Sequence, residues 1–141
     1  KDEKRQIINR YEMMKQNREV TKKRALSRWF TEKYIKNNPI IYKKIYSMLE
    51  KNNHENWLKV YKLFVYHEDD DMSIKQIKAK TLIVTGENDI GSRPEMTRAI
   101  SKIINESQYK IIKKGRHLCN IECPEAFNLI IKEFIDNNAS A

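Results

Sequence analysis

Hydrophobic side chains in the first half of the chain recur at the three- and four-residue spacing of an α-helix. Near the start, four of them predict an amphipathic helix over about residues 4 to 17: Ile7, Ile8, Tyr11 and Met14. The same spacing continues with no strand-like alternation, so residues 1 to about 72 are expected to form helices only.

Residues suited to helix starts divide this half into separate helices. Thr31 fits the N-cap of a short helix through Ile35, and Asn38 precedes Pro39, a residue favoured in a first helical turn. Asn53 can cap a further helix. Its predicted buried face is Trp57, Tyr61, Phe64 and Val65, and the preceding helix has an apolar stripe of Ile41, Ile45, Met48 and Leu49. The acidic residues 68 to 71 would end the last of these helices.

From Ser73 onward the pattern changes to an alternation of strand and helix. Residues 80 to 85 form a short apolar run, typical of a strand covered on both faces in a parallel sheet, and Gly86 is expected to end it. A second strand is predicted over residues 109 to 112. The helix between two such strands would make a right-handed β-α-β unit.

Each of the two helices predicted in this second half has a start signal. Ser92 and Glu95 have the spacing of a capping box, followed by the apolar residues Met96, Ile100, Ile103 and Ile104. Pro124 begins the final helix, whose inward residues would be Phe127, Ile130, Ile131 and Phe134. The predicted fold class is therefore α/β, with a helical segment followed by a β-α-β-α unit with parallel strands.

The charge of the chain is unevenly distributed. Lys and Arg outnumber Asp and Glu by 28 to 19, and the excess lies in residues 1 to 80, with 20 basic and 11 acidic side chains. Residues 81 to 141 are balanced at eight and eight. A basic segment such as residues 1 to 80 could bind a polyanion, for example a nucleic acid. Because the lysines are mixed with acidic residues throughout, a solvated surface is favoured over nucleic-acid binding.

The two cysteines and the lack of a long apolar run argue against a redox protein, a zinc protein and a membrane protein. Cys119 and Cys123 have neither the spacing of a redox motif nor a second His/Cys pair for zinc, so reduced, inert thiols and no metal site are expected. No run of 18 apolar residues exists, and the first residues show no signal peptide. We therefore expect no membrane association and a cytoplasmic protein.

An acid and a base stand out in the second half. Asp89 follows the first strand in a turn that begins at Gly86, and His117 lies on a loop shortly before the helix that begins at Pro124. Both residue types also occur in such places for structural reasons, as a turn carboxylate and a loop histidine. If both follow adjacent parallel strands, they should lie within roughly 2.6 to 3.2 Å of each other, as an orienting pair does.

The residues around this pair resemble the C-terminal half of an α/β-hydrolase. The turn from Gly86 to Asp89 matches the G-x-x-D turn that carries the catalytic acid of that family. The segment from residue 115 to residue 127 matches a G-x-H-L-x-x-x-E-x-P-E-x-F context for the catalytic histidine. The resemblance implies that His117 is the general base of a catalytic triad and that Asp89 fixes and stabilises its imidazole.

The helical half resembles the cap segment that such enzymes insert above the active site. Residues 28 to 31, followed by Asn38 and Pro39, are similar to the cap of the 3-oxoadipate enol-lactone hydrolase group. The implied organisation is a cap segment over residues 1 to 72 and a C-terminal core segment over residues 73 to 141. The aromatic residues Trp29, Phe30 and Trp57 would then line the substrate pocket, with cap-core packing as the alternative role.

The resemblance implies a hydrolase portion that acts on a small ester or lactone without a cofactor. The nucleophile elbow is not present, because the three glycines, Gly86, Gly91 and Gly115, include no pair four residues apart. The alternative is a catalytically inactive fragment or interaction module. Because a two-stranded sheet would leave an edge and apolar surface uncovered, we expect either the front half of the fold or a homo-oligomer to cover them.

Overall fold

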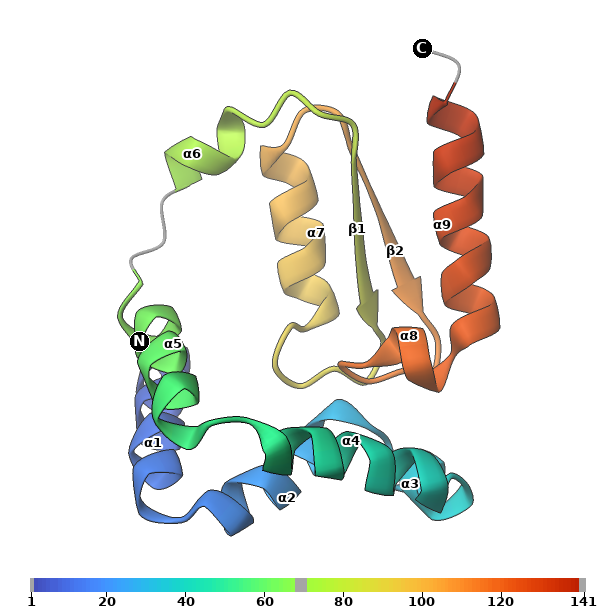
Figure 1. Ribbon diagram of the computed structural model, residues 1–141. Coiled ribbons are helices and arrows are strands. Elements are labelled where there is room, and N and C mark those ends of the chain that lie inside the picture. The colour runs from blue at the N-terminus through green and yellow to red at the C-terminus, as the bar shows by residue number, and fades with distance from the viewer. Residues whose placement is uncertain (1, 68–70, 140–141) are drawn as a thin grey trace. The chain divides into compact units, whose positions relative to one another are not determined.

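The computed structural model describes residues 2–67 and 71–139 (Figure 1). The helical spacing of apolar residues in the first half corresponds to five helices. They are α1 (Asp2–Gln16), α2 (Arg18–Trp29), α3 (Glu32–Asn37), α4 (Pro39–Lys51) and α5 (His54–Tyr66). The predicted helix over residues 4 to 17 and the starts at Thr31, Pro39 and Asn53 are confirmed. The prediction that acidic residues 68 to 71 end the last helix falls mostly outside the described residues.

The second half contains the predicted parallel pair of strands. Strand β1 (Thr81–Gly86) pairs with β2 (Ser107–Ile112), with Thr81 opposite Ser107 and Gly86 opposite Ile112. The helices of this half are α6 (Asp71–Lys75), α7 (Pro94–Ile103), α8 (Cys119–Glu122) and α9 (Pro124–Asn138). In Figure 1, α7 and α9 flank the two strands, and the carboxyl ends of both strands lead into the loops beside α8. The α/β class is confirmed.

The chain divides into two units that we describe separately. The first comprises Lys1–Ser27 and Ile35–Asp69, and the second comprises Arg28–Tyr34 and Asp70–Ala141. Residues 28 to 34 therefore group with the strands, although they lie within the predicted cap segment. The assignment of residues 1 to 72 as a cap and 73 to 141 as a core stays a prediction.

Aromatic packing joins α1 to α5 in the first unit. The ring of Tyr11 stacks on Tyr61 with centroids 6.3 Å apart, and it meets Tyr66 edge-on at 6.4 Å. Offset and edge-to-face ring pairs of this kind add to the burial of apolar area. Trp57 lies 6.1 Å from Tyr61 on the same helix. Phe64, predicted to be buried, is 58% exposed, because the contact with α1 reaches only part of the apolar face of α5.

Arg18 supports the end of α4 in the same unit. Its guanidinium donates to the main-chain oxygens of Leu49, Glu50 and Asn52 at 3.3, 2.8 and 2.6 Å. The last carbonyls of a helix have no partner within the helix, so a cation that donates to them stabilises its C-terminus. This contact fixes α2 against α4 and explains how a highly charged segment belongs to an ordered helix.

The capping box predicted at Ser92 and Glu95 does not form. Helix α7 begins at Pro94 with Arg93 as its N-cap, and no side chain caps it. The backbone of Ser92 is engaged elsewhere, since its N–H donates to Asp89 and its carbonyl accepts from the hydroxyl of Thr85 at 2.7 Å. The prediction that Gly86 ends the first strand is confirmed, because Gly86, which is paired with Ile112, is the last residue of β1.

No helix in residues 2–67 and 71–139 is both long and apolar enough to cross a bilayer. This agrees with the absence of an apolar run in the sequence.

Asn53→Ala is expected to lower the free energy of unfolding by about 1 kcal/mol. The Oδ1 of Asn53 accepts from the N–H of Asn56 at 3.0 Å and so satisfies a donor at the start of α5 that has no helical partner. Urea denaturation followed by circular dichroism measures the loss. Asn53→Asp keeps the acceptor and should restore most of the stability. Equal midpoints for Asn53→Ala and the unchanged protein would contradict the capping role.

Candidate functional site

Asp89 is held in a tight turn after β1. Its own N–H donates to the carbonyl of Gly86 at 3.1 Å, and its Oδ1 accepts from the N–H groups of Gly91 and Ser92 at 2.8 and 3.0 Å. The residue is only 5% exposed. These contacts fix the rotation of the carboxylate and leave the other oxygen, Oδ2, directed at a single partner.

That partner is His117. Its Nδ1 lies 2.8 Å from Oδ2 of Asp89, which confirms the predicted contact between the two side chains. An ionised carboxylate can only accept, so in the neutral imidazole this contact requires the proton on Nδ1 and leaves Nε2 as the acceptor. The imidazole is 45% exposed whereas the Asp89 side chain is 3% exposed. The pair thus has a buried, fixed carboxylate and an imidazole that is partly exposed.

The two loops that carry this pair are joined by main-chain hydrogen bonds. The N–H of Glu87 donates to the carbonyl of Ile112 at 2.8 Å, and that of Asn88 donates to Gly115 at 2.9 Å. The Oε2 of Glu87 accepts from the N–H of Lys114 at 3.0 Å. Because both strands are parallel, their carboxyl ends meet at one edge of the sheet. These hydrogen bonds hold the two loops together beyond that edge, where Asp89 and His117 lie.

Lys114 adopts a left-handed backbone conformation, with φ of 65°, between β2 and the histidine. A residue other than glycine adopts this conformation at a cost. The turn brings the carbonyls of Gly115 and Arg116 against the end of β1 at Gly86. The path of this loop therefore depends on how closely Gly86 allows the two backbones to approach.

The aromatic residues predicted to line a substrate pocket fall in both units. Phe30 is 1% exposed and its ring stacks on Tyr34 at 5.2 Å, so it contributes to packing. Trp29 is half-buried, and its carbonyl accepts from the N–H of Leu118 at 3.0 Å. Trp57 belongs to the first unit. A substrate-lining role for the three residues stays a prediction.

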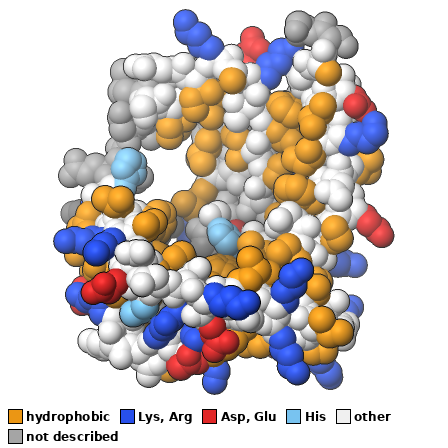
Figure 2. Space-filling view, viewed as in Figure 1, with side chains coloured by type: hydrophobic (Ala, Val, Ile, Leu, Met, Phe, Trp, Pro, Cys, Tyr) orange, Lys and Arg blue, Asp and Glu red, His pale blue; other side chains and the backbone are white. Residues whose placement is uncertain are grey.

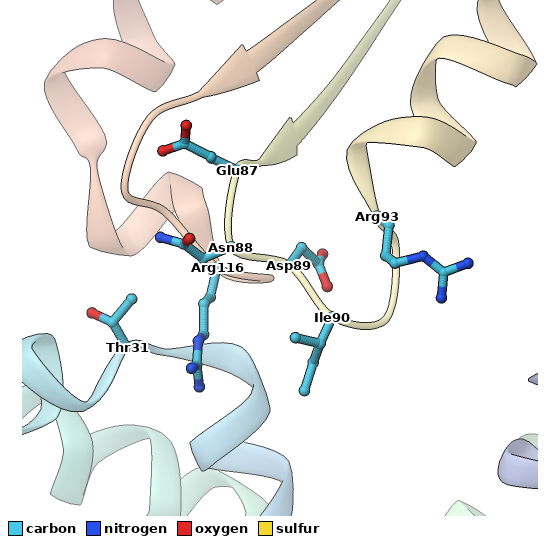
Figure 3. Close-up of a pocket in the computed structure, with 7 residues that line it drawn as sticks. All are labelled: Thr31, Glu87, Asn88, Asp89, Ile90, Arg93 and Arg116. Carbon is cyan, nitrogen blue, oxygen red and sulfur yellow. The ribbon is translucent and has the colours of Figure 1, made fainter.

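A pocket of about 410 Å³ opens beside Asp89 within the second unit (Figure 3). Side chains from four segments line it: Glu87, Asn88, Asp89 and Ile90 after β1, Arg93 before α7, Arg116 before His117, and Thr31 before α3. Arg93, Arg116 and Thr31 were not predicted from the sequence to belong to a site. For Arg116 a signal was present, since it stands directly before the candidate base.

Both cysteines are free thiols in the structure. Burial raises the pKa of the Cys119 thiol, and burial followed by the nearby charge of Glu122 raises the pKa of Cys123. Thiols with a raised pKa carry little thiolate at neutral pH and are weak nucleophiles. Residues 2–67 and 71–139 hold no group of three or more His, Cys, Asp or Glu side chains arranged to bind a metal ion.

Comparison with known proteins supports the fold assignment. No protein-family model and no curated protein matches the chain. Among solved structures, an enol-lactonase from Burkholderia xenovorans has a TM-score of 0.84 and 21% sequence identity, over 92% of this chain and 49% of that protein. An esterase from Thermogutta terrifontis has a TM-score of 0.82 and 22% identity, over 96% of this chain and 50% of that protein.

An esterase from Exiguobacterium antarcticum gives the same result, with a TM-score of 0.82 and 16% identity over 94% of this chain and 48% of that protein. The protein therefore has the fold of the C-terminal part of an α/β-hydrolase, as the sequence predicted. The 141 residues span about half the length of the solved structures that they match.

Proposed function

We propose that this chain is a portion of an α/β-hydrolase that acts on a small ester or lactone, and that it contributes the acid and the histidine of a catalytic triad. The observation that carries this proposal is the 2.8 Å contact between Oδ2 of Asp89 and Nδ1 of His117, with the second carboxylate oxygen held by two main-chain N–H groups. A carboxylate bound on one side and facing an imidazole on the other is the arrangement that an orienting acid requires.

The roles follow from this geometry. Asp89 keeps the proton of the neutral imidazole on Nδ1, so that Nε2 can accept the proton of a nucleophile as it attacks the carbonyl carbon of the substrate. The resulting imidazolium is stabilised by the carboxylate and returns the proton to the leaving oxygen. Water then repeats the sequence on the acyl-enzyme intermediate and regenerates the nucleophile.

The nucleophile is assigned to the front half of the fold. In this fold the elbow precedes the acid and the histidine in chain order. Its identity decides the reaction subtype, because a hydroxyl there forms an acyl-enzyme intermediate with an ester or lactone. The substrate class in our proposal rests on the enol-lactonase and the two esterases that share the fold.

The competing hypothesis is a catalytically inactive or self-associating module. Apolar side chains are exposed in the second unit, among them Tyr109 on β2 and Leu129 and Ile135 on α9, at 44%, 58% and 56%. Figure 2 shows hydrophobic side chains over the strands and their flanking helices on its visible face. In the hydrolase hypothesis the front half of the sheet covers such surface, and in the module hypothesis a second copy does.

One experiment separates these hypotheses, and a second tests whether the 141 residues are catalytic on their own. The gene sequence preceding the codon of Lys1 should encode a G-x-S-x-G elbow in the same reading frame, whereas a stop codon or an unrelated domain would favour the module.

The 141 residues expressed alone should hydrolyse a simple aryl ester no faster than the same chain with His117→Ala, because they lack a nucleophile and oxyanion donors. Turnover that disappears with this substitution would show that the chain is catalytically complete.

A further inference from the structure

The backbone on both sides of His117 is held by groups from α8 and from the end of α2. The N–H of Arg116, the residue before the histidine, donates to Oε2 of Glu122 at 2.7 Å. The N–H of Leu118, the residue after it, donates to the carbonyl of Trp29 at 3.0 Å. The N–H groups of the residues before and after the histidine are therefore both held, the first by a carboxylate and the second by a main-chain carbonyl.

The second oxygen of this carboxylate is also occupied. Oε1 of Glu122 accepts from the N–H of Thr31 at 2.9 Å and from the hydroxyl of Thr31. The hydroxyl oxygen in turn accepts from the N–H of Tyr34 at 3.2 Å and caps α3. One side chain thus joins the loop of the histidine to the start of α3, and all of these residues belong to the second unit.

We propose that Glu122 is a positioning residue for His117. Each of its oxygens faces donors, so the site suits an ionised carboxylate, and hydrogen bonds to a charged acceptor are stronger than those between neutral groups. By holding the N–H of Arg116, the residue before His117, Glu122 keeps Nδ1 of His117 at 2.8 Å from Oδ2 of Asp89. This role rests on the proposed function of His117 as the base.

A glutamine at position 122 would satisfy this site only in part. Its amide has one oxygen and one NH₂ group, and the NH₂ group would face either the N–H of Arg116 or the donors of Thr31. Two donors facing each other repel, and one of them loses its partner. The conservative variant therefore retains one of the two connections, whereas Glu122→Ala loses both.

The test compares Glu122→Ala, Glu122→Gln and Thr31→Val in the full-length protein, with Glu133→Gln as the matched control. Glu133 is an exposed carboxylate on α9. Two quantities are measured below the melting temperature of every variant: the nuclear magnetic resonance signal of the His117 Nδ1–H proton, and kcat and KM for an aryl ester.

Glu122→Ala should broaden or abolish the Nδ1–H signal and lower kcat about 10- to 100-fold with little change in KM, because a small displacement of a catalytic group costs this much. Glu122→Gln should lie between Glu122→Ala and the unchanged protein. Thr31→Val removes the hydroxyl but keeps the N–H donor, so its effect should be smaller than that of Glu122→Ala. Glu133→Gln should behave as the unchanged protein.

A lower melting temperature for Glu122→Ala, with an unchanged Nδ1–H signal and unchanged kcat, would overturn the proposal and make Glu122 a purely structural residue. If Glu122→Ala does not fold, Glu122→Gln and Thr31→Val provide the same comparison of signal and kcat. If the unchanged protein shows the Nδ1–H signal but no turnover, the proposed function fails, and the signal in the variants still decides whether Glu122 positions the imidazole.

Discussion

Asp89→Asn is expected to lower kcat of the full-length protein about 10⁴-fold, with KM nearly unchanged. The carboxamide oxygen can still accept from Gly91 and Ser92, which donate to Oδ1 of Asp89. Its NH₂ group then faces Nδ1 of His117 and requires that nitrogen to accept. The proton moves to Nε2, which can no longer take a proton from a nucleophile.

Steady-state kinetics on an aryl ester measure this loss, and Glu95→Gln is the matched control. Glu95 is an exposed carboxylate on α7 that forms ion pairs with two exposed arginines, Arg93 at 3.9 Å and Arg98 at 3.7 Å. The control should retain the activity of the unchanged protein. An Asp89→Asn variant that keeps more than a tenth of the activity would show that Asp89 does not orient the base.

The contact between Asp89 and His117 could be predicted because their positions follow from local patterns. A short apolar run predicts each strand, and a parallel pair places the residues that follow both strands at one edge of the sheet. Asp89 and His117 are three and five residues beyond the ends of β1 and β2. Their contact therefore required no knowledge of how the rest of the chain packs.

Glu122 and Thr31 could not be predicted as partners in the same way. They are 91 positions apart, and their contact depends on residues 28 to 34 packing with the second unit. The segment comprises the end of α2, the turn after it and the start of α3, and no pattern in it indicates which part of the chain it packs against. A contact of this kind follows from tertiary structure. The sequence places Glu122 in the segment that resembles the histidine context, and does not indicate its partner.

Helix α2 could not be predicted from the spacing of apolar residues for a different reason. It contains five basic residues, Arg18, Lys22, Lys23, Arg24 and Arg28, and was not predicted as a separate helix. Lys22 is only 8% exposed because its ammonium group pairs with Glu19 and lies 4.8 Å from the ring centre of Tyr46. A charged residue placed inward by such partners interrupts the apolar stripe by which a helix is recognised.

Gly86→Ala is expected to destabilise the second unit by about 1 to 3 kcal/mol and to separate His117 from Asp89. A Cβ at position 86 would lie 2.3 Å from the carbonyl oxygen of Arg116 and 2.4 Å from that of Gly115. Both contacts are with main-chain atoms, so no side chain can rotate to relieve them. The loop must move away from the end of β1, and it carries His117 with it.

Gly91→Ala is the matched control for this prediction, because its Cβ would meet only Oδ1 of Asp89 at 3.5 Å, an ordinary contact. Thermal denaturation should show a lower midpoint for Gly86→Ala and a nearly unchanged midpoint for Gly91→Ala. The Nδ1–H signal of His117 should weaken in the first variant and persist in the second. Equal midpoints and equal signals would mean that the loop tolerates the added methyl group, and that the approach of the two backbones does not set the distance between the acid and the base.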